Sequence, residues 1–195
     1  MAVPPDKMVR KETVEPQNVP ELFQMCSRLD PPTAVALIGI PGSGKTWITQ
    51  ECAKLISCDH TKDGKPMPLA VNRPKESGEF GLSQLNMTYL ECEDFVYPNI
   101  DIENKVYERL VIGSLPRTPY NLVSFEEIAK NPDIYRIAAQ LVNEGRLGFD
   151  YEVPEHTYFM ATSNRAEDKA GSFELHTDLI NRIIILEVVP TAKGF

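Results

Sequence analysis

The sequence lacks any apolar run long enough to cross a membrane, and its first residues lack the apolar segment of a secretory signal. It also lacks an excess of positive charge, because 28 Asp and Glu residues outnumber 20 Lys and Arg residues and give a formal net charge of -8. Binding to nucleic acid mainly through phosphate contacts needs clustered Lys and Arg. We therefore predict a cytoplasmic protein that has no membrane partner and does not use nucleic acid as its main partner.

Cysteines are few and show no metal-binding pattern. They are Cys26, Cys52, Cys58 and Cys92, and no two of them form a CxxC pair. A domain of this size needs no disulfide to hold it together. Cys58 and His60 lie close together in the sequence, but no second pair completes a zinc site. We predict reduced thiols and no structural zinc.

The composition is that of an ordinary globular domain. Hydrophobic residues make up 42% of the 195 residues and charged residues 25%, which argues against a long disordered region. A chain of this length fits one domain. We predict a core over residues 33–190, preceded by an N-terminal extension with a short helix (residues 1–32) and followed by a tail (residues 191–195).

Five segments predict strands. Residues 34–38 form a continuous apolar run, which is typical of a strand buried on both faces of a parallel sheet. Further strands are expected at residues 80–85, 121–125, 157–162 and 183–186. The stretches between them carry the helices.

The first three predicted helices have clear boundaries. One begins after Asn18, which is placed to cap it, and a second covers residues 46–57 with Trp47 on its buried side. Asn131 and Gly145 mark the start and the end of a third. Because strands and helices alternate along the chain, we predict a three-layer α/β fold with a mostly parallel central sheet.

The remaining stretches are predicted with less regular structure. Residues 146–155 favour a hairpin, and residues 173–180 favour a short helix. Residues 59–79 carry Lys, Pro and Gly without a clear period, which predicts a surface excursion. Residues 86–120 mix aromatic, acidic and proline residues and indicate no particular element.

A glycine-rich segment joins the first strand to the helix that follows it. Its residues are Gly39, Ile40, Pro41, Gly42, Ser43, Gly44, Lys45 and Thr46. They fit G-x-x-x-x-G-K-[ST] in the strand-to-helix context of a phosphate-binding loop, where backbone N–H groups and the positive end of the helix face the phosphates. We predict that Lys45 reaches the β- and γ-phosphates of ATP and that the Thr46 hydroxyl ligates Mg²⁺. Trp47, which follows directly, is expected among the nucleotide-contacting residues.

Hydrolysis of ATP also needs a carboxylate that helps to hold Mg²⁺ and a group that activates the attacking water. Glu126 and Glu127 end a predicted strand and can supply both, with Glu126 at the metal and Glu127 as the base. An acidic helix entry would give the same pattern. Asn164 follows the next strand and can hydrogen-bond the γ-phosphate or the water, although a turn Asn is the alternative.

Four segments in this order, GIPGSGKT, LVSFEEI, FMATSNRAEDKAG and LINRIIILEV, resemble the MoxR-like branch of the AAA+ ATPases over about residues 33–188. The first is specific only for P-loop proteins, whereas ATSN-R-x-x-D-x-A-G followed by L-x-N-R points to this branch. The roles that the resemblance implies are Walker A for Lys45 and Thr46, Walker B for Glu126 and Glu127, sensor 1 for Asn164, and arginine finger for Arg182. It also implies an ATP-driven remodelling or chaperone-like motor, working as a homo-oligomeric ring on a protein client or adaptor.

The sequence departs from this family in two places. The family usually has Asp at the first Walker B position, and Glu126 is one methylene longer, so slower turnover is expected. The helical lid that normally follows the core, with its sensor 2 arginine, has no room after Val189 and Pro190. We expect this lid to be absent or to be supplied by another chain, unless the sequence is a fragment.

Two other functions use the same loop. A nucleotide-dependent switch or scaffold would bind ATP with little hydrolysis, and Glu126 together with the missing lid favours it. A P-loop kinase would transfer the phosphate to an acceptor other than water. Such kinases commonly carry an Arg-rich lid and an acceptor site, and the sequence indicates neither.

Overall fold

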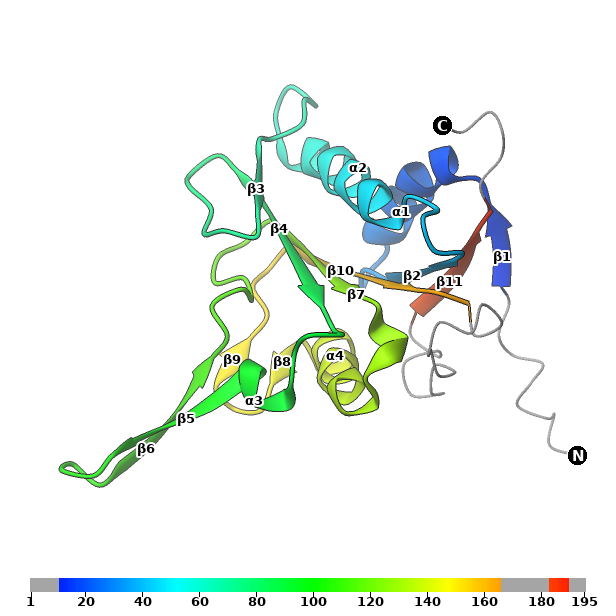
Figure 1. Cartoon of the computed structure of the whole chain (residues 1–195). Helices are drawn as coiled ribbons and strands as arrows, with labels where there is room; N and C mark the ends of the chain where they lie inside the picture. Colours follow the sequence, from blue (N-terminus) through cyan, green and yellow to red (C-terminus); the bar gives the residue numbers. More distant parts are fainter. Residues whose placement is uncertain (1–10, 166–182, 190–195) are drawn as a thin grey trace, which may run out of the picture.

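The computed structural model describes residues 11–165 and 183–189 (Figure 1). At its centre is a seven-stranded sheet in the order β1-β11-β2-β10-β7-β4-β3, in which all neighbouring strands run parallel. The strands are β1 Lys11–Val14, β2 Ala34–Gly39, β3 Leu69–Val71, β4 Phe80–Asn86, β7 Asn121–Glu126, β10 Thr157–Ser163 and β11 Ile183–Val188. The predicted α/β fold with a mostly parallel sheet is confirmed.

Helices cover both faces of this sheet (Figure 1). α1 Val19–Ser27 and α2 Lys45–Ser57 lie on one face, and α4 Pro132–Glu144 lies on the other. Each face has its own apolar core, one with α1 and α2 and the other with α4. The molecule therefore has the three layers that the sequence predicts.

Strand β2 shows why its sequence is a continuous apolar run. Val35 and Leu37 pack in the core that includes α1 and α2, whereas Ala36 between them packs in the core that includes α4. Successive side chains of a strand point to opposite faces, so a strand buried on both faces needs apolar residues at every position. This burial holds β2 in the middle of the sheet, where it can position the loop that follows it.

Two antiparallel hairpins and several short helices complete the described part. The hairpins are β5 Val96–Asp101 with β6 Val106–Val111, and β8 Arg146–Leu147 with β9 Tyr151–Glu152. The first hairpin follows the short helix α3 Cys92–Phe95 and extends away from the rest of the molecule (Figure 1). The second confirms the predicted hairpin. The 3-10 helices are Pro16–Asn18, Cys58–His60 and Ile128–Lys130. Within the described ranges, no helix has the length and apolar character needed to span a lipid bilayer.

Helix α4 begins and ends at the residues that the sequence indicates. The Asn131 side-chain oxygen accepts hydrogen bonds from the backbone N–H groups of Asp133 and Ile134, at 3.1 and 3.4 Å. These bonds satisfy donors that have no partner inside a first helical turn. Gly145 ends the helix with a φ of 66°, and its N–H donates to Leu141. Both predicted boundaries are confirmed.

Three details differ from the sequence predictions. Asn18 makes no capping bond, because it already belongs to a 3-10 turn and has helical backbone angles rather than the extended ones of a cap. Trp47 is 54% exposed, since the buried stripe of α2 runs through Ile48 and Cys52 on another side. Residues 59–79 contain the three-residue strand β3, which is too short to produce a readable period.

The N-terminal segment takes part in the central sheet. Strand β1 pairs in parallel with β11, and Val14 is buried in the same core as Phe23 of α1. The sequence analysis predicts only a helix in this region. The predicted helix over residues 173–180 lies outside the described residues.

Candidate functional site

The loop between β2 and α2 has backbone angles that require glycine. Gly42 and Gly44 have φ values of 78° and 77°, in the left-handed region. A Cβ at Gly42 would meet no atom within 4 Å, so the angle rather than crowding makes glycine necessary there. Gly39 is different, because a Cβ would lie 2.9 Å from the backbone oxygen of Val188 on the neighbouring strand. The loop is thus open on its outer side and closely packed where it leaves the sheet.

Lys45 begins helix α2 and points back into this loop. Its side chain is buried, and its ammonium donates to the backbone oxygens of Gly39 and Ile40 and to the side-chain oxygen of Asn164, each at 3.0 Å. All three of these acceptors are neutral. The Lys45 ammonium is therefore held at the inner side of the loop.

Asn164 links Lys45 to a carboxylate. Residue 164 follows β10, and its side-chain nitrogen donates to the two carboxylate oxygens of Glu127 at 3.1 and 2.8 Å. With its oxygen toward an ammonium and its nitrogen toward a carboxylate, each end of the amide faces the charge that it can bond. β10 lies between β2 and β7 in the sheet, which brings Lys45, Asn164 and Glu127 to one edge.

Glu127 has an unusual backbone conformation for its residue type. Its φ is 57°, in the left-handed region, and its N–H donates to the Thr162 hydroxyl of β10 at 3.4 Å. Left-handed backbone at a residue other than glycine costs free energy and tends to occur at functional sites. The Lys130 ammonium lies 3.7 Å from one carboxylate oxygen. The turn directs the Glu127 side chain toward Asn164 instead of along β7.

Glu126, the last residue of β7, lies next to Thr46. Its carboxylate accepts a hydrogen bond from the Gln84 side chain of β4 at 3.1 Å and another from the Thr46 hydroxyl. Burial raises the pKa of Glu126, and the nearby Glu127 charge adds to this rise, while the bonds from Gln84 and Thr46 oppose it. The carboxylate is therefore partly desolvated and would be stabilised by a cation.

The residues at this position fit Mg²⁺ bound together with a nucleotide. Thr46 and Glu126 place a hydroxyl and a carboxylate side by side, and both are hard oxygen ligands. In the described part of the chain, no group of three or more His, Cys, Asp or Glu side chains could hold a metal ion by itself. Mg²⁺ usually keeps several waters and takes substrate phosphates as further ligands, so two protein ligands are sufficient.

The buried hydroxyl of Ser43 is a further polar group in the loop. Among the described residues, its oxygen has no hydrogen-bond partner. Buried polar atoms are nearly always bonded, and one without a partner calls for an explanation such as a ligand. A phosphate oxygen in the loop would supply the acceptor that this hydroxyl lacks.

The structure brings together most of the residues that the sequence predicts for the site. Lys45, Thr46, Glu126, Glu127 and Asn164 gather at the carboxyl ends of β2, β7 and β10, where ligands of parallel α/β sheets bind. Their roles in binding and hydrolysis remain predictions.

Two predicted residues do not belong to this group. Trp47 lies on the surface of α2, and Arg182 lies outside the described residues. Gln84 is a further residue of the site that the sequence does not indicate. Its contact with Glu126 depends on the pairing of β4 with β7, and no local pattern in the sequence indicates which strand lies next to which.

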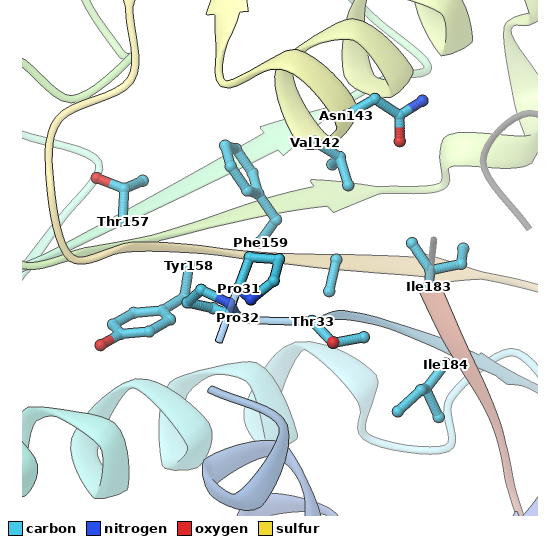
Figure 2. A pocket seen from close by; sticks show the side chains of 11 residues that line it. Pro31, Pro32, Thr33, Val142, Asn143, Thr157, Tyr158, Phe159, Ile183 and Ile184 are labelled. Carbon is cyan, nitrogen blue, oxygen red and sulfur yellow. The ribbon is translucent and has the colours of Figure 1, made fainter. Parts of the chain in front are cut away.

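A pocket of about 420 Å³ lies at the other ends of the strands, away from these residues (Figure 2). It is lined by the segments that lead into β2, β10 and β11 and by the end of α4, including Pro31, Thr33, Val142, Thr157 and Ile183. Figure 2 shows that Tyr158 and Phe159, which are neighbours in β10, point to opposite sides of this strand. The described residues that line this pocket include no carboxylate, cation or histidine.

No protein-family model matches this chain, and no curated protein matches it. Among solved structures, it is similar to the crystal structure of a candidate ATPase from Cytophaga hutchinsonii, with a TM-score of 0.55 and 15% sequence identity. The similarity covers 91% of this chain and 47% of that chain, so this chain spans about half the length of that protein. At this identity the similarity shows the fold alone, which is a three-layer α/β fold around a mostly parallel sheet.

Proposed function

We propose that this chain binds ATP with Mg²⁺ and hydrolyses the ATP. The observation that carries the proposal is the hydrogen-bonded series Lys45, Asn164 and Glu127, with the Thr46 and Glu126 pair beside it. These residues come from three separate parts of the sequence. A glycine turn with a purely structural role would not need a buried ammonium, a sensor amide and two carboxylates at one edge of the sheet.

Binding begins with the loop and Lys45. Backbone N–H groups of residues 42–46 and the positive end of α2 attract phosphate oxygens. The Lys45 ammonium now bonds two backbone oxygens and Asn164, and it exchanges at least one of these for a phosphate oxygen when ATP enters. A charged acceptor is a stronger partner than a neutral carbonyl, so this exchange favours the bound state.

Thr46 and Glu126 hold the metal. Mg²⁺ held there would supply positive charge to the phosphates of ATP. The Thr46 hydroxyl and the Glu126 carboxylate give it two oxygen ligands, and Gln84 keeps the carboxylate turned toward Thr46. Glu126 is longer than the Asp expected from the resemblance, but its contact with Thr46 means that the extra methylene does not carry the carboxylate away from the site.

Glu127 is the base in this proposal. A base must lie within hydrogen-bond reach of the water whose proton it accepts. Asn164 bonds both Glu127 oxygens, which fixes the direction of the carboxylate. When Lys45 turns to the phosphate, the Asn164 side-chain oxygen is freed to accept a hydrogen bond from the attacking water. Asn164 thus acts by positioning Glu127 and by sensing the nucleotide.

The wider role is a proposal from the resemblance. An ATP-driven remodelling motor would work as a homo-oligomeric ring on a protein client, with Arg182 of one subunit acting on the nucleotide of the next. A nucleotide-dependent switch with little hydrolysis is the second candidate. It is favoured by the engagement of Glu127 with both Asn164 and Lys130, which leaves its carboxylate less free to accept a proton.

One experiment tests the proposal and separates the two candidates. The sequence has one Trp, Trp47, and it lies exposed directly after Thr46, so its fluorescence should report ATP binding. Titration with ATP in the presence of Mg²⁺ is expected to give a saturable change, and phosphate release should follow. Binding without phosphate release at any protein concentration would favour the switch. No binding at all would overturn both.

A further inference from the structure

Another pocket lies beside strands β3 and β4, away from the loop that precedes α2. Its volume is about 420 Å³, and it is formed by residues 72–75 after β3, residues 81–83 of β4, and residues 113–118 and 121 at the entrance to β7. No residue of the loop 39–46 lines it. The pocket uses the first half of β4, whereas the nucleotide site lies at the carboxyl ends of the strands.

The lining of this pocket is rich in hydrogen-bond donors and positive charge. Its cationic and hydroxyl side chains are Arg73, Lys75, Arg117, Ser83, Ser114 and Thr118. The described residues that line it include no Asp or Glu, although acidic residues outnumber basic ones in the whole chain. A concave site with convergent donors is the usual form of a small-molecule site.

Two of the three cations are held by neutral groups. The Lys75 ammonium donates to the backbone oxygen of Pro119 and lies 5.6 Å from the centre of the Tyr120 ring. Arg117 donates to the backbone oxygen of Val111 at 2.9 Å. Carbonyl oxygens and aromatic faces attract a cation without cancelling its charge. Neither cation forms an ion pair with a described residue, and each is held by a bond to a backbone oxygen.

The Arg117 guanidinium also lies over an aromatic ring, 5.5 Å from the centre of Tyr151. The third cation, Arg73, differs because it forms two bonds to Glu79, at 2.9 and 2.5 Å. The carboxylate of Glu79 balances the charge of Arg73, and the Arg73 side chain forms part of the pocket lining. Burial lowers the pKa of Lys75, which agrees with an ammonium that is partly removed from water and has no anion beside it.

Other cations of the molecule form ion pairs with carboxylates. Arg28, Lys54 and Arg146 each pair with a carboxylate, at 2.7, 2.7 and 3.2 Å. The arrangement of Lys75 and Arg117 is unlike that of these paired surface cations.

We propose that this pocket binds the phosphate group of a small phosphorylated ligand, with Lys75 and Arg117 as the charged contacts. A phosphate monoester carries about two negative charges and three acceptor oxygens. Two fixed cations together with the hydroxyls of Ser114 and Thr118 match that charge and number of acceptors. A single carboxylate would leave one cation and several donors without a partner. The proposal does not depend on the proposed ATPase function.

The test uses inorganic phosphate as the probe and a Lys45→Ala background, which removes the phosphate site in the α2 loop. Binding is measured by calorimetry and by NMR shifts of the amides of residues 113–118. Saturable binding is expected, with shifts confined to this pocket. A second substitution pair, Lys75→Gln with Arg117→Gln, should weaken the binding at least about tenfold, because two charge-assisted bonds are lost.

The matched control is Lys54→Gln with Arg146→Gln, which removes the same charge from ion-paired surface positions. This control should bind phosphate as the background protein does. Equal weakening in both pairs, or no saturable binding in the background protein, would overturn the proposal. Acetate serves as the single-carboxylate probe, and binding of acetate as tight as that of phosphate would overturn the choice of phosphate. The single variants Lys75→Gln and Arg117→Gln keep the test decisive if the pair does not fold.

Discussion

The side-chain amide of Asn164 donates to both carboxylate oxygens of Glu127, at 3.1 and 2.8 Å, from a neighbouring strand of the sheet. The oxygen of the same amide accepts a bond from Lys45. One neutral side chain therefore joins the cation of the loop to the carboxylate proposed as the base. A change in the position of Lys45 when ATP binds would reach Glu127 through this single contact.

Replacing Lys45 by alanine should remove ATP binding without unfolding the protein. The ammonium is the cation that faces the phosphates, and losing it should weaken ATP binding by roughly 100-fold or more. Trp47 fluorescence measures the affinity, and circular dichroism checks the fold. The control is Lys54→Ala on the same helix, where the ammonium pairs with Glu51 at 2.7 Å. Tight ATP binding by folded Lys45→Ala protein would refute the assignment of the loop.

Replacing Glu127 by glutamine should keep ATP binding and remove hydrolysis. The amide has nearly the same shape and can still accept a bond from Asn164, but it cannot take a proton from water. Phosphate release should fall by roughly 100-fold or more while the fluorescence titration is unchanged. If Glu126→Gln and Glu127→Gln lose the same activities in the same proportion, the two roles have been divided wrongly.

Replacing Glu126 by glutamine should stabilise the protein without nucleotide and weaken its response to Mg²⁺. Burial raises the pKa of this carboxyl, so the folded state is penalised while the group is charged. At pH 7 the glutamine variant should melt roughly 2 °C higher. This advantage should disappear as the pH falls through the raised pKa toward the unfolded value of about 4.3, because the wild-type carboxyl is then neutral. An unchanged melting temperature at pH 7 would contradict the burial argument.

Local patterns in the sequence were sufficient to predict the central strands of the sheet and the glycine-rich loop between β2 and α2. β2, β7 and β10 are buried on both faces or nearly so, and such strands read as apolar runs whatever their neighbours are. Gly42 and Gly44 of the loop have positive φ angles, which only glycine adopts easily. Asn131 and Gly145 bound α4 for equally local reasons.

The other features of the fold and of the site could not be predicted from the sequence, because they depend on contacts between distant segments. β1 and β3 are edge strands of four and three residues, too short to show a period. The bond from Gln84 to Glu126 requires β4 to pair with β7 in one register. The placement of Lys75 and Arg117 in one pocket likewise requires two loops to meet. Sequence spacing contains none of this information.

His60 should make the stability of the protein fall at mildly acidic pH. Its ring packs against Tyr120 and His156, with ring centres 4.8 and 5.0 Å away, and its Nε2 lies 3.1 Å from the Tyr158 hydroxyl. Burial lowers the pKa of His60, and His156 lowers it further, while Asp59 opposes this. The neutral ring is therefore favoured in the folded state.

The unfolded chain then binds more protons than the folded one as the pH falls below about 6.5, so stability is lost from there down through the lowered pKa. Melting temperatures of the wild type and of His60→Gln, measured between pH 7.5 and 5, test this. The glutamine variant can still bond Tyr158 but does not titrate, so its melting temperature should fall less over this range. Parallel curves for the two proteins would show that His60 contributes nothing to the pH dependence.

Arg182 should act on the nucleotide of a neighbouring subunit. An arginine finger brings a fixed positive charge to the γ-phosphate as charge spreads in the transition state, and a second subunit can supply it. Specific ATPase activity should therefore rise with protein concentration. Arg182→Ala should keep its ATP affinity and lose turnover by roughly 1,000-fold or more.

Mixing two inactive variants gives the sharpest test of this arrangement. In a mixture of Arg182→Ala and Lys45→Ala, some interfaces pair the intact loop of one subunit with the intact arginine of the other. Activity should return in the mixture but in neither protein alone. The control is a mixture of Arg182→Ala with the double variant Lys45→Ala/Arg182→Ala, which offers no intact arginine and should stay inactive. If the first mixture also stays inactive although the two proteins assemble together, or if a dilute monomer hydrolyses ATP at the full rate, Arg182 does not act between subunits.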